Sequence, residues 1–289
     1  MGLRGSDILY TNLVIATGML GLVYVWFRRQ AHAPQWALLG TSTIALSMVT
    51  LTTIRYGGYC DALTYLLVFC AWWTRAKLWL SSSLYYFAML NHEAAVFLTP
   101  WLLVAQVLER GRSDSAAHPG DGPRPRAWFA AAAGIAGAVL AFALTRALLL
   151  RLNPGPEYTF HFYMDPLLKD PLYWYRQSSQ HRVLGALAAF NLYWVLPVLA
   201  GIHLVWRRQF ASAAVILLPI LCALAALFVA FDVTRMLTLS FMGMLLGTEY
   251  LIRTDAFRAR RLILLLSVAN FFVPQVNVAQ GTVDGMLRR

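Results

Sequence analysis

The sequence contains few charged residues for its length. Asp, Glu, Lys and Arg make up 13% of the 289 residues, whereas hydrophobic residues make up 59%. The charged share is about half of the roughly 25% found in soluble domains. The apolar residues recur in runs of about twenty, the length at which a helix crosses a hydrocarbon core about 30 Å thick. This composition excludes an ordinary soluble domain and predicts an integral membrane protein.

Strictly alternating polar and apolar residues are also missing from these runs. A transmembrane barrel needs short strands in which lipid-facing and lumen-facing residues alternate. A helix satisfies all of its backbone hydrogen bonds within one segment and needs no such alternation. We therefore expect an all-α fold, a polytopic transmembrane bundle of about ten spans, some of them short or broken.

Cysteine is scarce. Cys60, Cys70 and Cys222 lie in or beside apolar runs and form no C-x-x-C pair, which excludes a disulfide framework or a cysteine zinc site. Nucleic acid is not an expected partner either. The formal net charge is +11, but the basic residues form short clusters between apolar runs, where they act as topology signals.

Ten apolar segments can be recognised, and together they form a single transmembrane domain over residues 1–289. The segments 61–73, 78–90 and 94–108 are short for a full crossing of the membrane. The ten are 8–27, 36–54, 61–73, 78–90, 94–108, 127–150, 183–206, 210–230, 236–252 and 262–279.

The basic clusters orient the bundle. If the spans alternate, more than half of the basic residues fall on one side, which the positive-inside rule makes cytoplasmic. Residues 109–126, rich in Gly, Pro, Ser and Arg, are predicted to be a flexible cytoplasmic linker. Residues 151–182 mix aromatic, proline and charged residues and are predicted to be an outer, periplasmic or lumenal loop that packs over the bundle. The basic clusters are Arg28–Arg29, Arg75 and Lys77, the arginines of 109–126, Arg207–Arg208, and Arg253 with the arginines at 258, 260 and 261.

Ionisable side chains gather on the opposite, outer face. Arg55 and Asp61 flank a Gly-Gly turn between two spans, and His92 and Glu93 lie between two short apolar segments. An ionisable group beside apolar helices is costly, so each needs a partner or a function. Arg55 could equally be a snorkelling arginine, and Asp61 a helix N-cap. A carboxylate can act as a general base and histidine can carry a proton, although a polar surface turn would also explain His92 and Glu93.

Two further groups complete the outer face. Asp232 and Arg235 are three residues apart and can pair on one helix face, while the guanidinium fork would also suit a phosphate. In the 151–182 loop, His161 and Arg176 lie among many aromatic residues. Aromatic side chains beside polar groups are typical of carbohydrate sites and of interfacial helices. We expect the groups at 55–61, 91–93 and 231–235 to converge in space.

These features resemble the GT-C superfamily of polytopic membrane glycosyltransferases. The segments Asp61-Ala62-Leu63-Thr64-Tyr65, Asn91-His92-Glu93 followed by Pro100, and Asp232-Val233-Thr234-Arg235 carry the resemblance. Members usually place a catalytic aspartate in the first outer loop, after an N-terminal span. Here no span precedes Asp7. Either Asp7 takes that position with the preceding helix missing, or another carboxylate acts.

The resemblance implies transfer of a sugar from a polyprenyl-phosphate carrier to a carbohydrate or lipid acceptor, at the outer face of a bacterial inner membrane. Glu93 or Asp61 would be the catalytic base and His92 an orienting group. Arg55, Asp232 and Arg235 would bind substrate, with His161 and Arg176 contributing from the loop. The resemblance identifies no specific cofactor; a divalent metal could take part, but no spacing of ligands demands one.

Two alternatives stay open. A polysaccharide polymerase or ligase is a neighbouring chemistry in which the arginines and histidines of 151–182 would matter most. A transporter or flippase would perform no covalent chemistry and should place polar groups at mid-membrane. The interiors of the spans are nearly free of charge apart from Arg146, which favours a site at the surface over a transport pathway.

Overall fold

The computed structural model describes residues 5–30, 32–55, 61–117, 125–152, 160–177, 181–228, 232–273, 276–279 and 282–285. Within these ranges the chain is helical almost throughout, which confirms the all-α class. The described ranges contain one hairpin besides the helices. Its strands, β1 (Val276–Ala279) and β2 (Thr282–Gly285), are antiparallel and pair Val276 with Gly285. The last predicted span, 262–279, is therefore wrong at its end, where β1 replaces helix.

Each apolar segment contains at least one helix. Four segments each correspond to one unbroken helix, which extends a few residues beyond the prediction or coincides with it: α1 (Gly5–Arg29), α4 (Asp61–Trp73), α5 (Leu78–Asn91) and α7 (Pro125–Leu152). Helix α12 (Phe210–Ala226) and helix α15 (Ala256–Phe272) cover most of two others. Apolar run length thus located these helices correctly.

The remaining four segments are broken. They contain α2 (Pro34–Ala45) with α3 (Met48–Arg55), η1 (Glu93–Leu98) with α6 (Thr99–Ala117), α10 (Arg182–Phe190) with η3 (Asn191–Trp194) and α11 (Val195–Trp206), and α13 (Val233–Thr238) with α14 (Phe241–Thr254).

Local chemistry explains two of these breaks. Between α2 and α3, the Ser47 hydroxyl donates to the Ile44 carbonyl at 2.8 Å, and such a side-chain bond competes with the helical ladder. Between α10 and η3, Asn191 has a φ of 48° and a ψ of −129°, and a residue with these dihedral angles cannot continue a right-handed helix. The Leu192 amide that follows donates to Asn270 Oδ1 at 2.9 Å, so a side chain of α15 satisfies the interrupted backbone.

Three stretches are long and apolar enough to cross a membrane, Asp7–Arg29, Trp128–Leu152 and Arg182–Trp206. Two shorter helices, Asp61–Trp73 and Phe210–Ala226, are also apolar. These stretches indicate a membrane protein. The predicted count of ten spans is not confirmed, because most of the segments fold as helices too short or too interrupted for an independent crossing.

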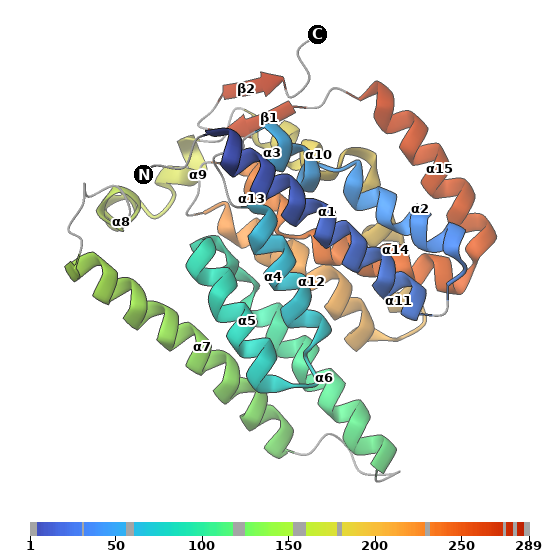
Figure 1. The fold of residues 1–289 in the computed structure, drawn as a ribbon, viewed down its shortest axis with the longest axis horizontal. Helices are drawn as coiled ribbons and strands as arrows, with labels where there is room; N and C mark the ends of the chain where they lie inside the picture. The colour runs from blue at the N-terminus through green and yellow to red at the C-terminus, as the bar shows by residue number, and fades with distance from the viewer. Residues whose placement is uncertain are drawn as a thin grey trace.

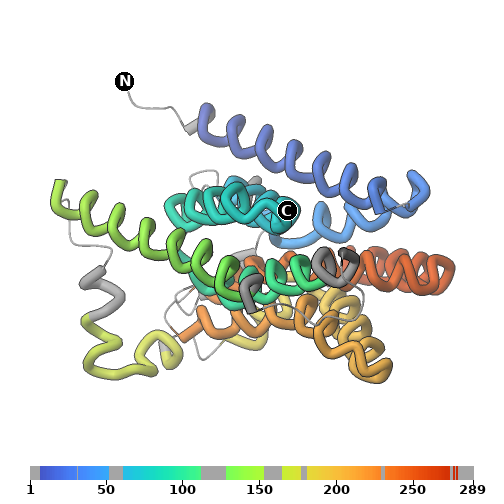
Figure 2. Tube along the Cα trace, turned by 90° about the horizontal axis from the view of Figure 1, so that it is seen from below, coloured from blue at the N-terminus to red at the C-terminus, as the bar shows by residue number. Residues whose placement is uncertain are grey.

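The helices form a layered bundle. In Figure 2, α1 lies on one side and α11 and α12 on the other, with α4, α5 and α14 between them. Helix α1 packs on α2 and α4, and α14 packs on α2, α11 and α12. Close approach of α14 to its neighbours requires glycine: a Cβ at Gly247 would lie 2.7 Å from Pro197 Cα, and one at Gly243 2.6 Å from the Ile216 carbonyl oxygen.

Helix α7 lies at the edge of the bundle, against α5 and α6 (Figure 1). Only 11% of the residues in its most apolar stretch are buried, and Phe129, Leu140 and Leu144 are exposed. In a membrane protein an apolar surface of this kind faces lipid acyl chains.

The two connections singled out in the sequence contain helices. Helix α6 continues to Ala117, so the first half of 109–126 is helical, and residues 118–124 lie outside the described residues. The 151–182 segment contains α8 (Phe160–Lys169) and α9 (Tyr173–Gln177). The ring of Tyr175, in α9, stacks on that of Phe228, with centroids 5.2 Å apart.

Candidate functional site

Three of the polar groups expected on the outer face lie at helix ends. Asp61 is the first residue of α4. His92 separates α5 from η1 in an extended conformation, and its Nδ1 accepts a hydrogen bond from the Ala94 amide at 3.3 Å. Asp232 caps α13 by accepting from the Arg235 amide at 3.1 Å. Unpaired backbone amides at helix N-termini favour such acceptors. This local preference explains why these polar residues lie at the ends of helices.

Asp61 and Arg235 form the centre of the site. Arg235 Nε donates to Asp61 Oδ2 and Arg235 Nη2 to Asp61 Oδ1, both at 2.8 Å. This is the bidentate arrangement in which the guanidinium fork matches a carboxylate. Because both Asp61 oxygens are occupied and the residue is buried, Asp61 is poorly suited to abstract a proton from a substrate.

Asp232 and His92 complete the group, which we call the outer cluster (Asp61, His92, Asp232 and Arg235). Asp232 Oδ2 accepts from Arg235 Nη1 at 3.3 Å. His92 Nε2 lies 3.7 Å from Asp61 Oδ1 and 3.4 Å from Arg235 Nη2. The sequence prediction that the segments around Asp61, His92 and Asp232–Arg235 converge is therefore confirmed.

The outer cluster is screened from water, and burial shifts its protonation. Burial raises the pKa of Asp232 to about 6, although the adjacent Arg235 opposes the shift. Burial also lowers the pKa of His92, against the opposing charge of Asp61. Loss of hydration disfavours the charged form in both residues. The lowered pKa of His92 favours its neutral imidazole form and makes this side chain harder to protonate.

Neighbouring hydroxyls and amides hold the cluster in place. The Thr238 hydroxyl donates to the Arg235 carbonyl at 2.6 Å and lies 2.5 Å from the Tyr65 hydroxyl. Asn91 Nδ2 donates to the Thr64 hydroxyl at 2.7 Å, which ties the end of α5 to α4 one residue before His92. Such supporting bonds fix side-chain positions and reduce the freedom of the charged groups.

Glu93 lies beside the cluster but outside it. The exposed fraction of the side chain is 5% at Asp61 and 11% at Arg235. It increases to 21% at His92 and 54% at Glu93. Glu93 Oε2 is 3.9 Å from Nη2 of Arg146, on α7. The side of the cluster at His92 and Glu93 is therefore the more exposed one, and there an accessible carboxylate and an arginine are adjacent.

Arg146 was not among the predicted site residues. Its signal in the sequence is its position, because it is a charged residue inside a predicted span, as is Glu249. A charge at such a position is costly and usually marks a function or a specific partner. The partner, Glu93, is 53 positions earlier in the sequence, and nothing in the local pattern connects the two.

The other predicted site residues are not placed in the cluster. Arg55 is the last residue of α3 and His161 lies in α8, but the side chains of both fall outside the described residues. Arg176 is largely exposed and pairs with Asp170, Nη1 to Oδ2 at 3.2 Å, within the 151–182 segment. No group of three or more His, Cys, Asp or Glu side chains that could hold a metal ion occurs within the described ranges.

The arrangement thus combines a buried Asp–Arg–Asp–His group with an accessible Glu–Arg pair, at one end of a helical bundle that contains membrane-length apolar helices. Comparisons with protein-family models, with curated proteins and with solved structures found no match to this chain.

Proposed function

We propose that the protein is a membrane glycosyltransferase that takes a sugar from a polyprenyl-phosphate carrier at the outer face of a bacterial inner membrane and adds it to a carbohydrate or lipid acceptor. The observation that carries the proposal is the convergence of Asp61, His92, Asp232 and Arg235, with Glu93 and Arg146 beside them. The short segments that contain Asp61, His92–Glu93 and Asp232–Arg235 are also those that resemble polytopic glycosyltransferases.

Glu93 is the catalytic base in this proposal. Its carboxylate takes the proton of an acceptor hydroxyl, the acceptor oxygen forms a bond to the anomeric carbon, and the bond from that carbon to the carrier phosphate oxygen breaks. The carrier leaves as a phosphate with the bonding electrons. An accessible carboxylate beside a site that excludes water suits this role, whereas the carboxylate of Asp61 is occupied by Arg235.

Arg146 stabilises the leaving phosphate. Its side chain is partly exposed on α7, next to an apolar surface against which a polyprenyl chain can lie. A guanidinium placed where negative charge develops lowers the barrier to bond breaking. Arg235 would have to give up its two bonds to Asp61 before it could bind phosphate, so we assign it to positioning His92 and the neighbouring Glu93.

The test is transfer of radiolabelled sugar from a polyprenyl-phosphate sugar to endogenous acceptors in membranes that contain the protein. Glu93→Gln should lower the rate by about two to four orders of magnitude, the usual cost of a lost general base. Arg146→Lys should also lower the rate, because lysine keeps the charge but loses the fork. Asp255→Asn and Arg151→Lys, which change exposed charges outside the cluster, should transfer sugar at the wild-type rate.

Wild-type rates in Glu93→Gln would move the base to Asp232 or His92. If the wild-type protein transfers no sugar from any polyprenyl-phosphate donor, the enzymatic proposal fails. Movement of the intact lipid-linked sugar across the membrane of proteoliposomes would then favour the transporter or flippase alternative.

A further inference from the structure

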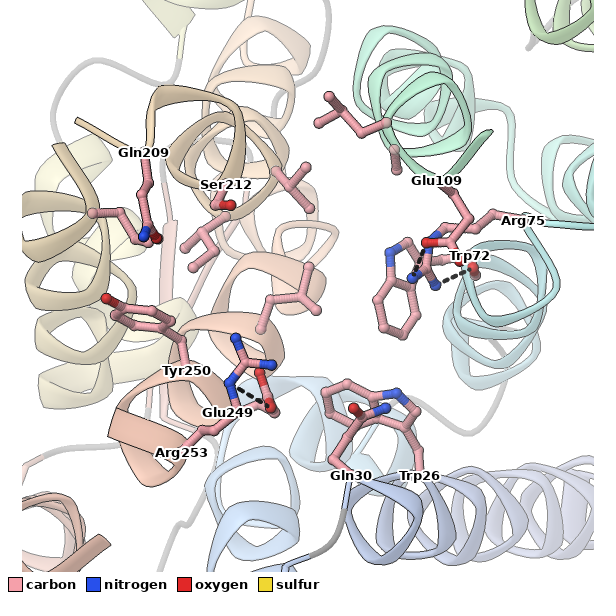
Figure 3. Close-up of a pocket in the computed structure, with 16 residues that line it drawn as sticks. Trp26, Gln30, Trp72, Arg75, Glu109, Gln209, Ser212, Glu249, Tyr250 and Arg253 are labelled. Carbon is pink, nitrogen blue, oxygen red and sulfur yellow. Dashed lines mark hydrogen bonds and ion pairs between the residues drawn. The ribbon is translucent and has the colours of Figure 1, made fainter. Parts of the chain in front are cut away.

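Polar and apolar side chains line a cleft of about 190 Å³ (Figure 3), which lies at the opposite end of the bundle from the outer cluster. Helix α4 connects the two sites: Asp61 begins the helix in the outer cluster, and Trp72, near its end, lines the cleft. Eleven residues of α-helix span about 16 Å. The cleft is also lined from α1 (Trp26), α6 (Glu109), α12 (Ser212) and α14 (Glu249), and it lies among the segments predicted to be cytoplasmic.

The charges in the cleft lining balance. Arg75 Nη2 donates to Glu109 Oε2 at 2.8 Å. Across the cleft, Arg253 Nε lies 4.0 Å from Glu249 Oε1 (Figure 3). His32, behind Glu249, approaches the same oxygen at 3.6 Å. Two arginines face two glutamates, so the lining favours a ligand with no net charge over a phosphate or a metal cation.

One buried donor in the lining, Trp72 Nε1, forms no hydrogen bond within the described part of the chain, and its side chain is 4% exposed. Glu249 Oε1 also accepts no hydrogen bond there, but it lies within ion-pair distance of His32 and Arg253. Leaving a buried donor unsatisfied costs about 1–3 kcal/mol. A ligand that accepts from Trp72 would recover this cost.

Aromatic faces form one wall. The rings of Trp26 and Trp72 meet edge to face, with centroids 5.3 Å apart, and Tyr250 lines the cleft from α14. The side chains of Gln30, Gln209 and Ser212 add further hydrogen-bonding groups. Apolar ring surface combined with a few oriented polar groups is typical of small-molecule sites.

We propose that this cleft binds a neutral polyhydroxy molecule of monosaccharide size. A hydroxyl group donates and accepts at once, so one sugar can accept from Trp72 Nε1 and donate to the Glu249 carboxylate. Its C–H face can pack on the indole rings. The volume, equal to that of about six liquid waters at roughly 30 Å³ each, fits one sugar ring. The site rests on different residues from the proposed transfer reaction and stands or falls separately.

The experiment is equilibrium binding of tritiated glucose, galactose and mannose to the purified protein in lipid nanodiscs. We expect saturable binding of at least one hexose, at least tenfold tighter than binding of the corresponding hexose 6-phosphate. Glu249→Gln and Trp72→Phe should each weaken it by about tenfold, the change in Kd that corresponds to 1.4 kcal/mol.

Matched controls are Trp79→Phe, at an exposed tryptophan, and Asp255→Asn, one residue beyond the end of α14. Both should bind like the wild type. Unchanged thermal midpoints would show that the cleft variants fold. The proposal is overturned if no hexose binds saturably or if both cleft variants bind like the wild type. It is also overturned if phosphoethanolamine, a zwitterion that could pair with the charges of the lining, binds more tightly than every hexose.

Discussion

Both carboxylate oxygens of Asp61 accept hydrogen bonds from the guanidinium of Arg235, at 2.8 Å each, across a sequence separation of 174 residues. The pair joins α4 to α13 and is shielded from water. Removing one member of a buried ion pair leaves an uncompensated charge, which is far more costly than losing an exposed pair.

We therefore expect Asp61→Asn to lower the free energy of unfolding by about 3–5 kcal/mol, because Arg235 would lose its closest counter-charge. Arg258→Gln breaks an exposed pair with Asp255 and should cost about 1 kcal/mol or less. Denaturant unfolding in detergent micelles measures both. An Asp61→Asn protein as stable as Arg258→Gln would contradict the importance of the buried pair.

Stability should depend on pH through Asp232. Its pKa in the folded state is raised to about 6 from an ordinary value of 3.8. The folded protein therefore holds a proton that the unfolded chain has already released. Its contribution to stability is fully present below about pH 4 and is lost as the pH rises through about 6.

The measurement for Asp232 is the thermal midpoint of the wild type relative to Asp232→Asn between pH 4 and 7. This difference should decrease as the pH rises. The depressed pKa of His92 acts in the opposite direction, since its contribution is lost as the pH falls below about 6.5. His92 is present in both proteins, so its effect largely cancels in the comparison. A difference that is flat across this range would contradict the raised pKa of Asp232.

Gly247→Ala should destabilise the bundle. A Cβ at this position would meet the Pro197 backbone at 2.7 Å, so α11 and α14 would have to separate. Such overpacking typically costs about 1–3 kcal/mol. Gly137→Ala is the matched control, because a Cβ there has no neighbour within 4 Å. Alanine has the higher helix propensity, so this control should keep or raise the thermal midpoint. Equal midpoints for the two variants would exclude close packing at Gly247.

Accessibility labelling tests the orientation. In a chain whose native cysteines have been replaced, Leu168→Cys should react with a membrane-impermeant maleimide added from the outer side. Arg258→Cys should react only from the cytoplasmic side. Both positions are exposed, so lack of access would reflect the membrane rather than packing. Reaction of both positions from the same side would overturn the alternating topology and the assignment of the cluster to the outer face.

Local sequence patterns determined where most helices lie. Apolar run length placed α1, α4, α5 and α7 within a few residues, because helix formation in an apolar setting depends on hydrogen bonds within one segment. The patterns also singled out Asp61, His92 and Asp232 as polar residues at helix ends. Run length could not reveal the break at Asn191, since that depends on one residue's conformation and on an acceptor supplied by Asn270 of α15.

Tertiary packing alone decided which polar residues meet. The sequence predicted that Asp61, Glu93 and Arg235 share one face. It did not predict the bidentate hydrogen bonds between Arg235 and Asp61, which leave Glu93 as the accessible carboxylate. The partner of Arg146 and the cleft between Trp72 and Glu249 likewise required the fold, because each joins helices that are distant in sequence. Hydrogen bonds and ion pairs act over a few ångströms of space, whereas the periodicity of a sequence reports only on neighbours along one helix.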